Sequence, residues 1–207
     1  MQSRGWRGDQ PANDDEARKR IIAAAMRCLD RYGPLKTGLS DVATELGVTR
    51  QTVYRLYPST EELLFAVAEA AADAFVNRMV ARARRHTDPA EMLVECLAFT
   101  LERLPKERYL SLLVVPDRRA SFTRHITSVA GFDLTNTLLS RLPVDWPALG
   151  VGEPQREAII EIWLRTLQSF ALDPGPARTR NELRAFLRQW MAPAIDSVSE
   201  QPGTRAG

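Results

Sequence analysis

Cysteine and histidine are both scarce in this chain, which contains two of each among its 207 residues. Cys28 and Cys96 lie in apolar stretches with helical spacing, and neither has a second cysteine or a histidine at the spacing of a metal site. Their number and spacing argue against a disulfide framework and a zinc site. We interpret both thiols as buried in a reducing cytoplasm, and we predict a cytoplasmic protein without a metal or cofactor.

Long apolar runs and phosphate-binding loops are also missing. No stretch approaches the roughly 20 apolar residues that a helix needs to cross a bilayer, so we expect no membrane partner. The amino-terminal residues lack an apolar core, which argues against a signal peptide. His86 and His125 lie in different regions, and no glycine-rich phosphate loop is present. These absences argue against an enzyme.

Neither sign of charge dominates, because 28 Lys and Arg residues face 26 Asp and Glu residues. A net charge of +2 neither requires nor excludes a nucleic-acid partner, since phosphate binding depends on where the cations lie. The hydrophobic fraction of 44% is ordinary for a globular protein, and the length suits one large domain or two small ones.

Apolar residues recur with helical spacing along almost the whole chain, while the alternation typical of strands is absent. We therefore predict an all-α protein of about nine helices, and we expect Pro193 to kink or shorten the last one. The expected helices cover residues 14–32, 39–46, 50–57, 60–85, 89–104, 107–114, part of 118–142, 153–172 and 180–198. The expected domains are a disordered arm (1–13), a DNA-binding domain (14–60), a helical ligand-binding and dimerisation domain (61–200) and a disordered tail (201–207).

Residues 37–64 have the outline of a helix-turn-helix. A short amphipathic segment ends at Gly47, which supplies a left-handed turn residue. Thr49 can cap a second, shorter segment that is dense in hydrogen-bonding side chains. In such a motif the second helix can lie in the major groove of DNA. The sequence therefore predicts double-stranded DNA as a partner.

The chemistry of the second segment suits this partner. The Arg50 guanidinium can fork onto guanine or clamp a phosphate, and Gln51 can pair with adenine or contact the backbone. First-turn amides and the helix dipole favour a phosphate. Tyr54 and Arg55 follow one turn later near the same face, whereas we expect Tyr57 in the core. The candidate DNA-binding residues are Lys36, Thr37, Ser40, Thr49, Arg50, Gln51, Thr52, Tyr54 and Arg55.

These residues carry a family resemblance. The segments RIIAAAMRCLDRYG, T-x-x-S-D-V-A-x-x-L-G-V-T and T-V-Y-R-L-Y-P-S-T-E-E-L resemble the tetracycline-repressor (TetR-type) family of bacterial transcription regulators over residues 18–65. The resemblance implies DNA contacts from the first turn of the second segment, the following tyrosine and its neighbour. Gly38, Leu56 and Thr60 depart from the family pattern. Gly38 has no hydroxyl for a phosphate, and Thr60 replaces a common lysine.

The resemblance further implies dimerisation through the last two long helices and an effector pocket enclosed by the middle helices. Wide apolar faces on the last two helices agree with a dimer seam. Mixed aromatic and aliphatic side chains favour an apolar or aromatic effector. The candidate dimer residues are Ile160, Trp163, Leu164, Leu167, Phe170, Leu183, Phe186, Leu187 and Trp190. The candidate pocket residues are Phe75, Met79, Met92, Cys96, Phe99, Tyr109, Leu112, Phe122, His125 and Trp163.

The sequence thus favours a repressor that binds a palindromic operator as a homodimer and is released by a small effector. The alternative is a helical ligand-binding or protein-interaction module that no longer binds DNA, for which the changes at Gly38 and Thr60 give some reason. The amino-terminal arm is a separate question. Arg4, Trp6 and Arg7 could enter a minor groove, although a disordered tail is the better interpretation.

Overall fold

The computed structural model describes residues 5–113 and 126–200 of the chain. Within these ranges it contains eight α-helices, four short 3-10 helices and no strand, so the prediction of an all-α protein is confirmed. The chain divides into two compact units. Unit 1 comprises Met1–Asp73 and Arg108–Leu113, and unit 2 comprises Ala74–Glu107 and Val114–Gly207. In the described ranges, no helix is both long and apolar enough to span a bilayer.

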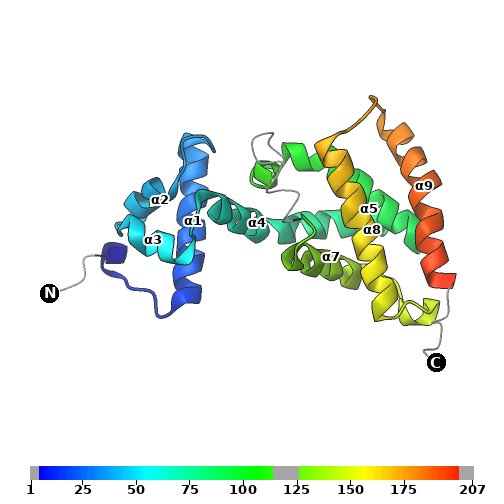
Figure 1. Cartoon of the computed structure of the whole chain (residues 1–207), viewed down its shortest axis with the longest axis horizontal. Coiled ribbons are helices and arrows are strands. Elements are labelled where there is room, and N and C mark those ends of the chain that lie inside the picture. Colours follow the sequence, from blue (N-terminus) through cyan, green and yellow to red (C-terminus); the bar gives the residue numbers. More distant parts are fainter. Residues whose placement is uncertain (1–4, 114–125, 201–207) are drawn as a thin grey trace. The chain divides into compact units, whose positions relative to one another are not determined.

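Unit 1 is built on α1 (Asp14–Tyr32), α2 (Leu39–Leu46) and α3 (Arg50–Leu56), which pack on one another (Figure 1). The bounds of α1 and α2 are those predicted, and α3 ends one residue earlier than expected. Each helix turns its apolar residues inward, so Ile21, Val42 and Val53 are fully buried together. Local signals therefore decide where these helices begin and end.

The boundary between the units lies inside α4 (Thr60–Ala83), after Asp73, and not at residue 60 as predicted. The first turns of α4 bury Leu63, Leu64 and Val67 in the core of unit 1. Because these side chains complete that core, the start of α4 belongs to the same compact unit as α1–α3.

The amino-terminal segment is more ordered than expected. Residues Gly5–Gly8 form the 3-10 helix η1, and Trp6 packs against the core of unit 1. Arg20 donates to the backbone carbonyl oxygen of Asp9 and forms an ion pair with its carboxylate. The prediction of a disordered arm is therefore wrong for residues 5–13, because an indole ring and an ion pair attach them. Residues 1–4 and the predicted tail, 201–207, lie outside the described ranges.

A segment distant in sequence also joins unit 1. Residues Leu110–Leu113 form the 3-10 helix η3, where a short helix over 107–114 was expected. Leu112 is buried in the core of unit 1. The Tyr109 hydroxyl donates to Asp30 at 2.9 Å, and the Arg108 guanidinium pairs with the same carboxylate at 2.8 Å. Asp30 near the end of α1 thus receives two donors from this segment.

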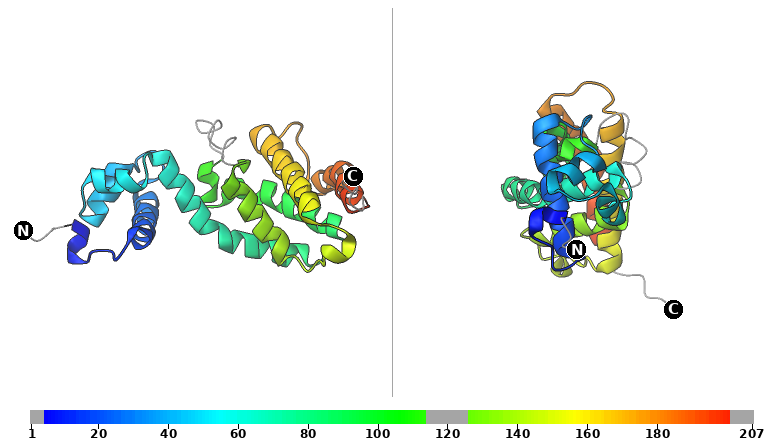
Figure 2. Two further views of the ribbon diagram at one scale, coloured as in Figure 1. Left: turned by 60° about the horizontal axis from the view of Figure 1, so that its bottom comes forward. Right: turned by 90° about the vertical axis from the view of Figure 1, so that its left-hand side faces the viewer.

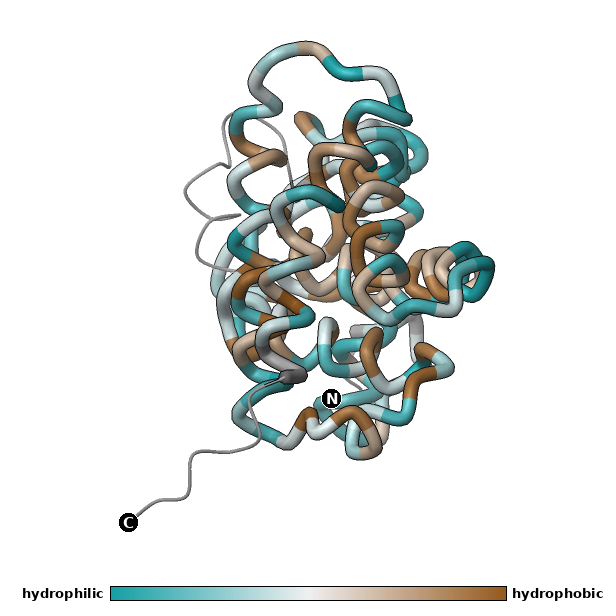
Figure 3. The backbone as a smooth tube through the Cα atoms, turned by 90° about the vertical axis from the view of Figure 1, so that its right-hand side faces the viewer, coloured by the Kyte–Doolittle hydropathy of each residue, from teal (hydrophilic) through white to brown (hydrophobic). Residues whose placement is uncertain are grey.

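Unit 2 contains α5 (Pro89–Arg103), η2 (Leu104–Lys106), α7 (Val129–Arg141), η5 (Pro147–Leu149), α8 (Glu153–Leu172) and α9 (Arg180–Glu200). Helix α5 packs against α8 and α9, and α7 packs against α8 (Figure 2). Hydrophobic and hydrophilic residues alternate around the helical turns (Figure 3). The inward residues include Leu93, Ile159 and Leu187, which are almost completely buried.

Two local predictions in unit 2 need correction. The expected loop over residues 143–153 contains η5, and Trp146 is buried there while its indole N–H donates to the carbonyl oxygen of Leu139 at 3.1 Å. Pro193 does not shorten α9, which continues to Glu200, so of its two predicted effects only a kink stays a prediction. Seven residues therefore follow the proline in the same helix, because a proline removes one backbone donor without preventing the later turns.

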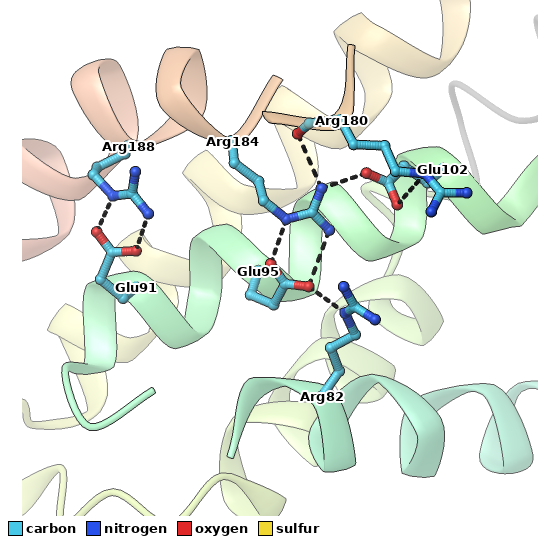
Figure 4. Close-up of polar contacts among 7 residues, drawn as sticks. All are labelled: Arg82, Glu91, Glu95, Glu102, Arg180, Arg184 and Arg188. Carbon is cyan, nitrogen blue, oxygen red and sulfur yellow. Dashed lines mark hydrogen bonds and ion pairs between the residues drawn. The ribbon is translucent and has the colours of Figure 1, made fainter. Parts of the chain in front are cut away.

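A buried carboxylate connects three helices of unit 2. Glu95 of α5 is 5% exposed and accepts hydrogen bonds from Arg82 of α4 at 2.6 Å and from Arg184 of α9 at 2.6 and 3.0 Å (Figure 4). Arg184 also pairs with Glu102 of α5. Burial by itself raises the pKa of Glu95, but the hydrogen bonds from the two guanidinium groups outweigh it and hold the pKa below its usual range.

We predict that Glu95→Gln destabilises the fold far more than Glu91→Gln. Glu95→Gln removes one partner of a buried network and leaves guanidinium charge uncompensated, which typically costs about 3–5 kcal/mol. The Glu91–Arg188 pair joins the same two helices, α5 and α9, but is more exposed, so its loss should cost about 0–1 kcal/mol. Urea unfolding of each variant measures the difference.

The same network predicts a pH dependence. Since the pKa of Glu95 is lower in the folded than in the unfolded chain, its stabilisation is present at neutral pH and is lost as the pH falls below the usual glutamate pKa of 4.5 and through the folded value. Glu95→Gln should remove this part of the acid destabilisation. Equal acid sensitivity of wild type and variant would contradict the assignment.

Candidate nucleic-acid interface

The turn between α2 and α3 has the geometry that the sequence predicts. Gly47 lies in the left-handed region at φ 68° and ψ 32°, and the amide of Val48 donates to the carbonyl oxygen of Ala43 at 2.9 Å. Thr49 then caps α3, since its hydroxyl oxygen accepts a hydrogen bond from the amide of Thr52. The two hydroxyl groups also lie 2.9 Å apart. These local contacts set the start of α3.

Helix α3 has one buried and one exposed face. Val53 and Leu56 are buried in the core of unit 1, and Tyr57 after the helix is buried as predicted. Tyr54 is 53% exposed. A shallow hollow on the exposed face brings together five of the predicted DNA-binding residues, Thr49, Gln51, Thr52, Tyr54 and Arg55.

Arg50 and Gln51 are exposed in the first turn of α3. Within the ranges that the structure describes, neither side chain forms a hydrogen bond or an ion pair. Their guanidinium and amide groups are therefore available to an external partner. An arginine and a glutamine side by side suit both base edges and phosphates.

Helix α1 holds the carboxyl end of α3. Arg18 donates to the backbone carbonyl oxygen of Leu56 at 2.9 Å, and its guanidinium carbon lies 5.3 Å from the centre of the Tyr57 ring. The first contact satisfies a carbonyl at the helix end, and the second is a cation–π contact. Arg18 did not emerge from the sequence because no local pattern links it to residues 38 positions away.

Arg55 is occupied within the chain. Its two terminal nitrogens donate to the two carboxylate oxygens of Asp14 at 3.1 and 2.8 Å. The hydrogen bonds between the two side chains are the main reason that the pKa of Asp14 is lowered and the pKa of Arg55 is raised. The predicted DNA-binding role of Arg55 thus competes with an ion pair that the sequence did not reveal.

The residues before and at the start of α2 behave differently from one another. Lys36 and Ser40 are exposed. Thr37 is only 5% exposed, and its hydroxyl donates to the carbonyl oxygen of Gly33 at 2.8 Å. The Thr37 hydroxyl is therefore buried and already donates inside unit 1, and a DNA contact from this residue stays a prediction that this hydrogen bond does not favour.

Gly38 caps α2 without a side chain. Its amide donates to the Asp41 carboxylate at 2.9 Å, which is one half of a capping box. A Cβ atom at Gly38 would meet the Asp41 carboxylate at 3.6 Å and the Thr60 hydroxyl at 3.7 Å, both ordinary contact distances. The backbone therefore has room for a side chain, and the missing hydroxyl is a property of this sequence and not of the fold.

The predicted pocket residues divide between the two units. In unit 2 the rings of Phe75 and Phe99 lie 5.4 Å apart, and the Thr100 hydroxyl donates to the carbonyl oxygen of Cys96 and lies 3.3 Å from the Met79 sulfur. Burial raises the pKa of the Cys96 thiol to about 12, as expected for an inert cysteine. Met92 and Trp163 are also buried in unit 2, where the Trp163 indole donates to Leu93.

Tyr109 and Leu112 instead pack in unit 1, whereas the other described pocket candidates belong to unit 2. Phe122 and His125 lie outside the described residues. A different cavity, of about 430 Å³, lies in unit 2 between the end of α5 and the α8–α9 connection. Phe170, Arg178 and Leu183 contribute to its lining.

Five of the nine predicted dimer residues are buried inside unit 2, where they contact their own chain. These are Ile160, Trp163, Leu164, Leu167 and Leu187. Phe170, Leu183 and Phe186 are half-buried, and Trp190 is 63% exposed. Ile162, which is not among the predicted dimer residues, is also exposed on α8. The apolar surface left on α8 and α9 is therefore narrower than their apolar stripes suggest.

Comparison with known proteins supports the predicted family and fold. The model of the family described as "Bacterial regulatory proteins, tetR family" matches residues 21–67. An uncharacterised HTH-type transcriptional regulator of Mycobacterium tuberculosis is 24% identical over 186 residues, which cover 88% of this chain and 87% of that protein.

Two solved structures share the fold. The crystal structure of the TetR family repressor AlkX from Dietzia sp. strain DQ12-45-1b has a TM-score of 0.56 and 21% identity, covering 90% of this chain and 99% of AlkX. Thermus thermophilus FadR, a TetR family repressor in complex with lauroyl-CoA, has a TM-score of 0.53 and 17% identity, covering 92% and 99% of the two chains.

Proposed function

The chain belongs to the tetR family of bacterial regulatory proteins, and we propose that it represses transcription by binding a palindromic operator as a homodimer. Members of this family are DNA-binding regulators and not enzymes. The observation that carries the proposal is the exposed face of α3, where Arg50 and Gln51 have no partner within the described chain beside the hollow lined by Thr49, Thr52 and Tyr54.

Recognition would place α3 in the major groove. Arg50 can donate two hydrogen bonds to a guanine edge, and Gln51 can pair with adenine. Lys36 and Ser40 add exposed donors from the segment that leads into α2 and from its first turn. In a dimer, two copies of α3 would read half-sites about 34–36 Å apart, which is one turn of DNA.

We predict that Arg50→Ala weakens operator binding by about 1–3 kcal/mol and relaxes the preference for one base pair, if Arg50 forks onto a base edge. A uniform loss on all duplexes would make Arg50 a phosphate contact. Binding isotherms on DNA flanking the coding region and on single-base variants of it distinguish the two outcomes.

Arg103→Ala is the matched control, because it removes one exposed guanidinium that lies outside α3 and outside the proposed dimer helices and that pairs with Glu107. It should leave DNA binding unchanged. If wild-type protein binds no duplex at low salt, the repressor proposal fails, and a helical ligand-binding or protein-interaction module remains. Steep salt dependence together with sequence preference would support a regulator.

We infer that α8 and α9 form the dimer contact through the apolar groups that remain exposed. Among the side chains that the structure describes on these helices, Trp190 and Ile162 are the exposed large apolar ones. The Phe186 ring lies 6.5 Å from that of Trp190 and 5.8 Å from that of Phe170, so three neighbouring aromatic rings lead from the exposed Trp190 on α9 to the half-buried Phe170 on α8. A central exposed tryptophan is typical of residues that dominate an interface.

Trp190→Ser should therefore raise the dissociation constant of the dimer at least tenfold, as measured by sedimentation equilibrium. Loss of a central interface tryptophan commonly costs about 2 kcal/mol or more. Leu149→Ser removes another exposed apolar side chain, on η5, and should leave the dimer intact. If the Trp190→Ser protein remains fully dimeric, this surface is not the dimer contact.

We also propose that a small apolar or aromatic effector binds in unit 2 among the side chains of α4 and α5, near Phe75, Met79 and Phe99. Support comes from the apolar character of these groups and from the half-buried position of Phe99. Because α4 continues from unit 1 into unit 2, an effector that favours another angle of this helix would change the half-site spacing and release the operator.

Lauroyl-CoA is a suitable probe for this effector site, with CoA alone as the control for its polar part. Calorimetric titration should show binding that requires the acyl chain. Phe99→Ala should weaken it by up to about 1.5–3 kcal/mol, the value of a fully covered ring. Phe170→Ala, in the cavity near α9, should have little effect. If Phe170→Ala loses more affinity for lauroyl-CoA than Phe99→Ala does, the effector site is that cavity instead.

A further inference from the structure

We call the exposed face of α3, with Arg50, Gln51 and the hollow beside them, the reading surface. The contact between Asp14 and Arg55 lies at its edge. Arg55 helps to line the hollow on α3 that also contains Gln51 and Tyr54. Asp14 opens α1, directly after the cap residue Asn13. Both side chains are about 60% exposed, so the pair is reached by solvent and by any ligand of this surface.

The geometry of this pair imitates a phosphate contact. Both terminal nitrogens of the Arg55 guanidinium donate to the two oxygens of one carboxylate. Arginine binds a phosphate with the same fork of two parallel N–H groups. A DNA phosphate and the Asp14 carboxylate therefore compete for the same donors, and Arg55 cannot serve both in this geometry.

The other charged group close to the pair is already engaged elsewhere. Arg18 acts on Asp14 electrostatically, but its guanidinium donates to the carbonyl oxygen of Leu56 and lies over the Tyr57 ring. Asp14 therefore forms its direct hydrogen bonds with Arg55 alone among the described residues. The positive end of the α1 dipole also favours a carboxylate at this position.

We propose that Asp14 is an intramolecular competitor of DNA phosphate: it keeps the Arg55 fork closed on non-specific DNA and so lowers the sequence-independent affinity of the reading surface. The inference rests on the proposed DNA-binding function. A lower affinity for non-specific DNA raises the ratio of operator affinity to non-specific affinity. This ratio matters because the genome offers many non-specific sites that compete with the operator.

Asp14→Asn should bind a labelled random-sequence duplex more tightly than wild type, by roughly two- to fivefold, the usual strength of an exposed ion pair. The released Arg55 should also steepen the slope of log affinity against log salt by about 0.9 for each bound copy of the surface, since one more phosphate is neutralised. Asp14→Glu retains a carboxylate and should return both values toward those of wild type.

Asp15→Asn is the matched control. It removes the same charge from the same helical turn, and Asp15 forms no ion pair in the described ranges. A general loss of negative charge would raise affinity equally in both variants. In an Arg55→Ala background, Asp14→Asn and Asp15→Asn should become equivalent, which completes a double-mutant cycle.

The proposal is overturned if Asp14→Asn and Asp15→Asn behave alike in the wild-type background, or if the effect of Asp14→Asn persists without Arg55. Weaker binding by Asp14→Asn would also overturn it and would make Asp14 a residue that positions Arg55 for DNA. Wild-type protein that binds no duplex at low salt would instead refute the proposed function itself, so the two failures are distinguishable.

Discussion

The shortness of α3 is the constraint on which the reading surface depends. A helix of seven residues is too short to be stable by itself, because its few hydrogen bonds cannot offset the cost of nucleation. Unit 1 therefore holds α3 at its start, along its inner face and at its end. Thr49 caps its start, Val53 and Leu56 fix its inner face, and Arg18 satisfies a carbonyl at its end. The exposed face is free to carry recognition chemistry because none of these contacts uses Arg50 or Gln51.

Charge in this chain acts through placement and not through its total. Although the net charge is only +2, arginines act in two different ways, in a buried ion-pair network and on an exposed surface. In unit 2, Arg82 and Arg184 pair with the buried Glu95 and so join α4, α5 and α9 (Figure 4). These ion pairs stabilise the fold only while every buried charge has its partner. On unit 1, Arg50 is exposed while Arg55 is paired at the surface. The electrostatic footprint for DNA is thus smaller than a count of cations on α3 suggests.

The departures from the family pattern shape how unit 1 could bind DNA. A Cβ atom at Gly38 would lie 3.7 Å from the Thr60 hydroxyl. Gly38 lacks the hydroxyl, and Thr60 lacks the lysine, that the family resemblance implies at these two positions. Thr37 directs its hydroxyl inward to Gly33. With fewer donors around α2, the proposed affinity must come largely from the first turn of α3 and from pairing two copies. This makes the exposed aromatic surface of α9 as important to the proposed function as the reading helix.

The sequence by itself determined the all-α class and the bounds of α1, α2 and α8, because caps, left-handed glycines and apolar periodicity act between residues at most a few positions apart. The tertiary structure alone decided which residues meet across the chain. Arg55 meets Asp14 over 41 positions and Arg184 meets Glu95 over 89, while Leu112 joins unit 1 and much of the predicted dimer stripe fills the core of its own unit. An apolar or charged residue shows by its type that it needs a partner, but only packing selects that partner.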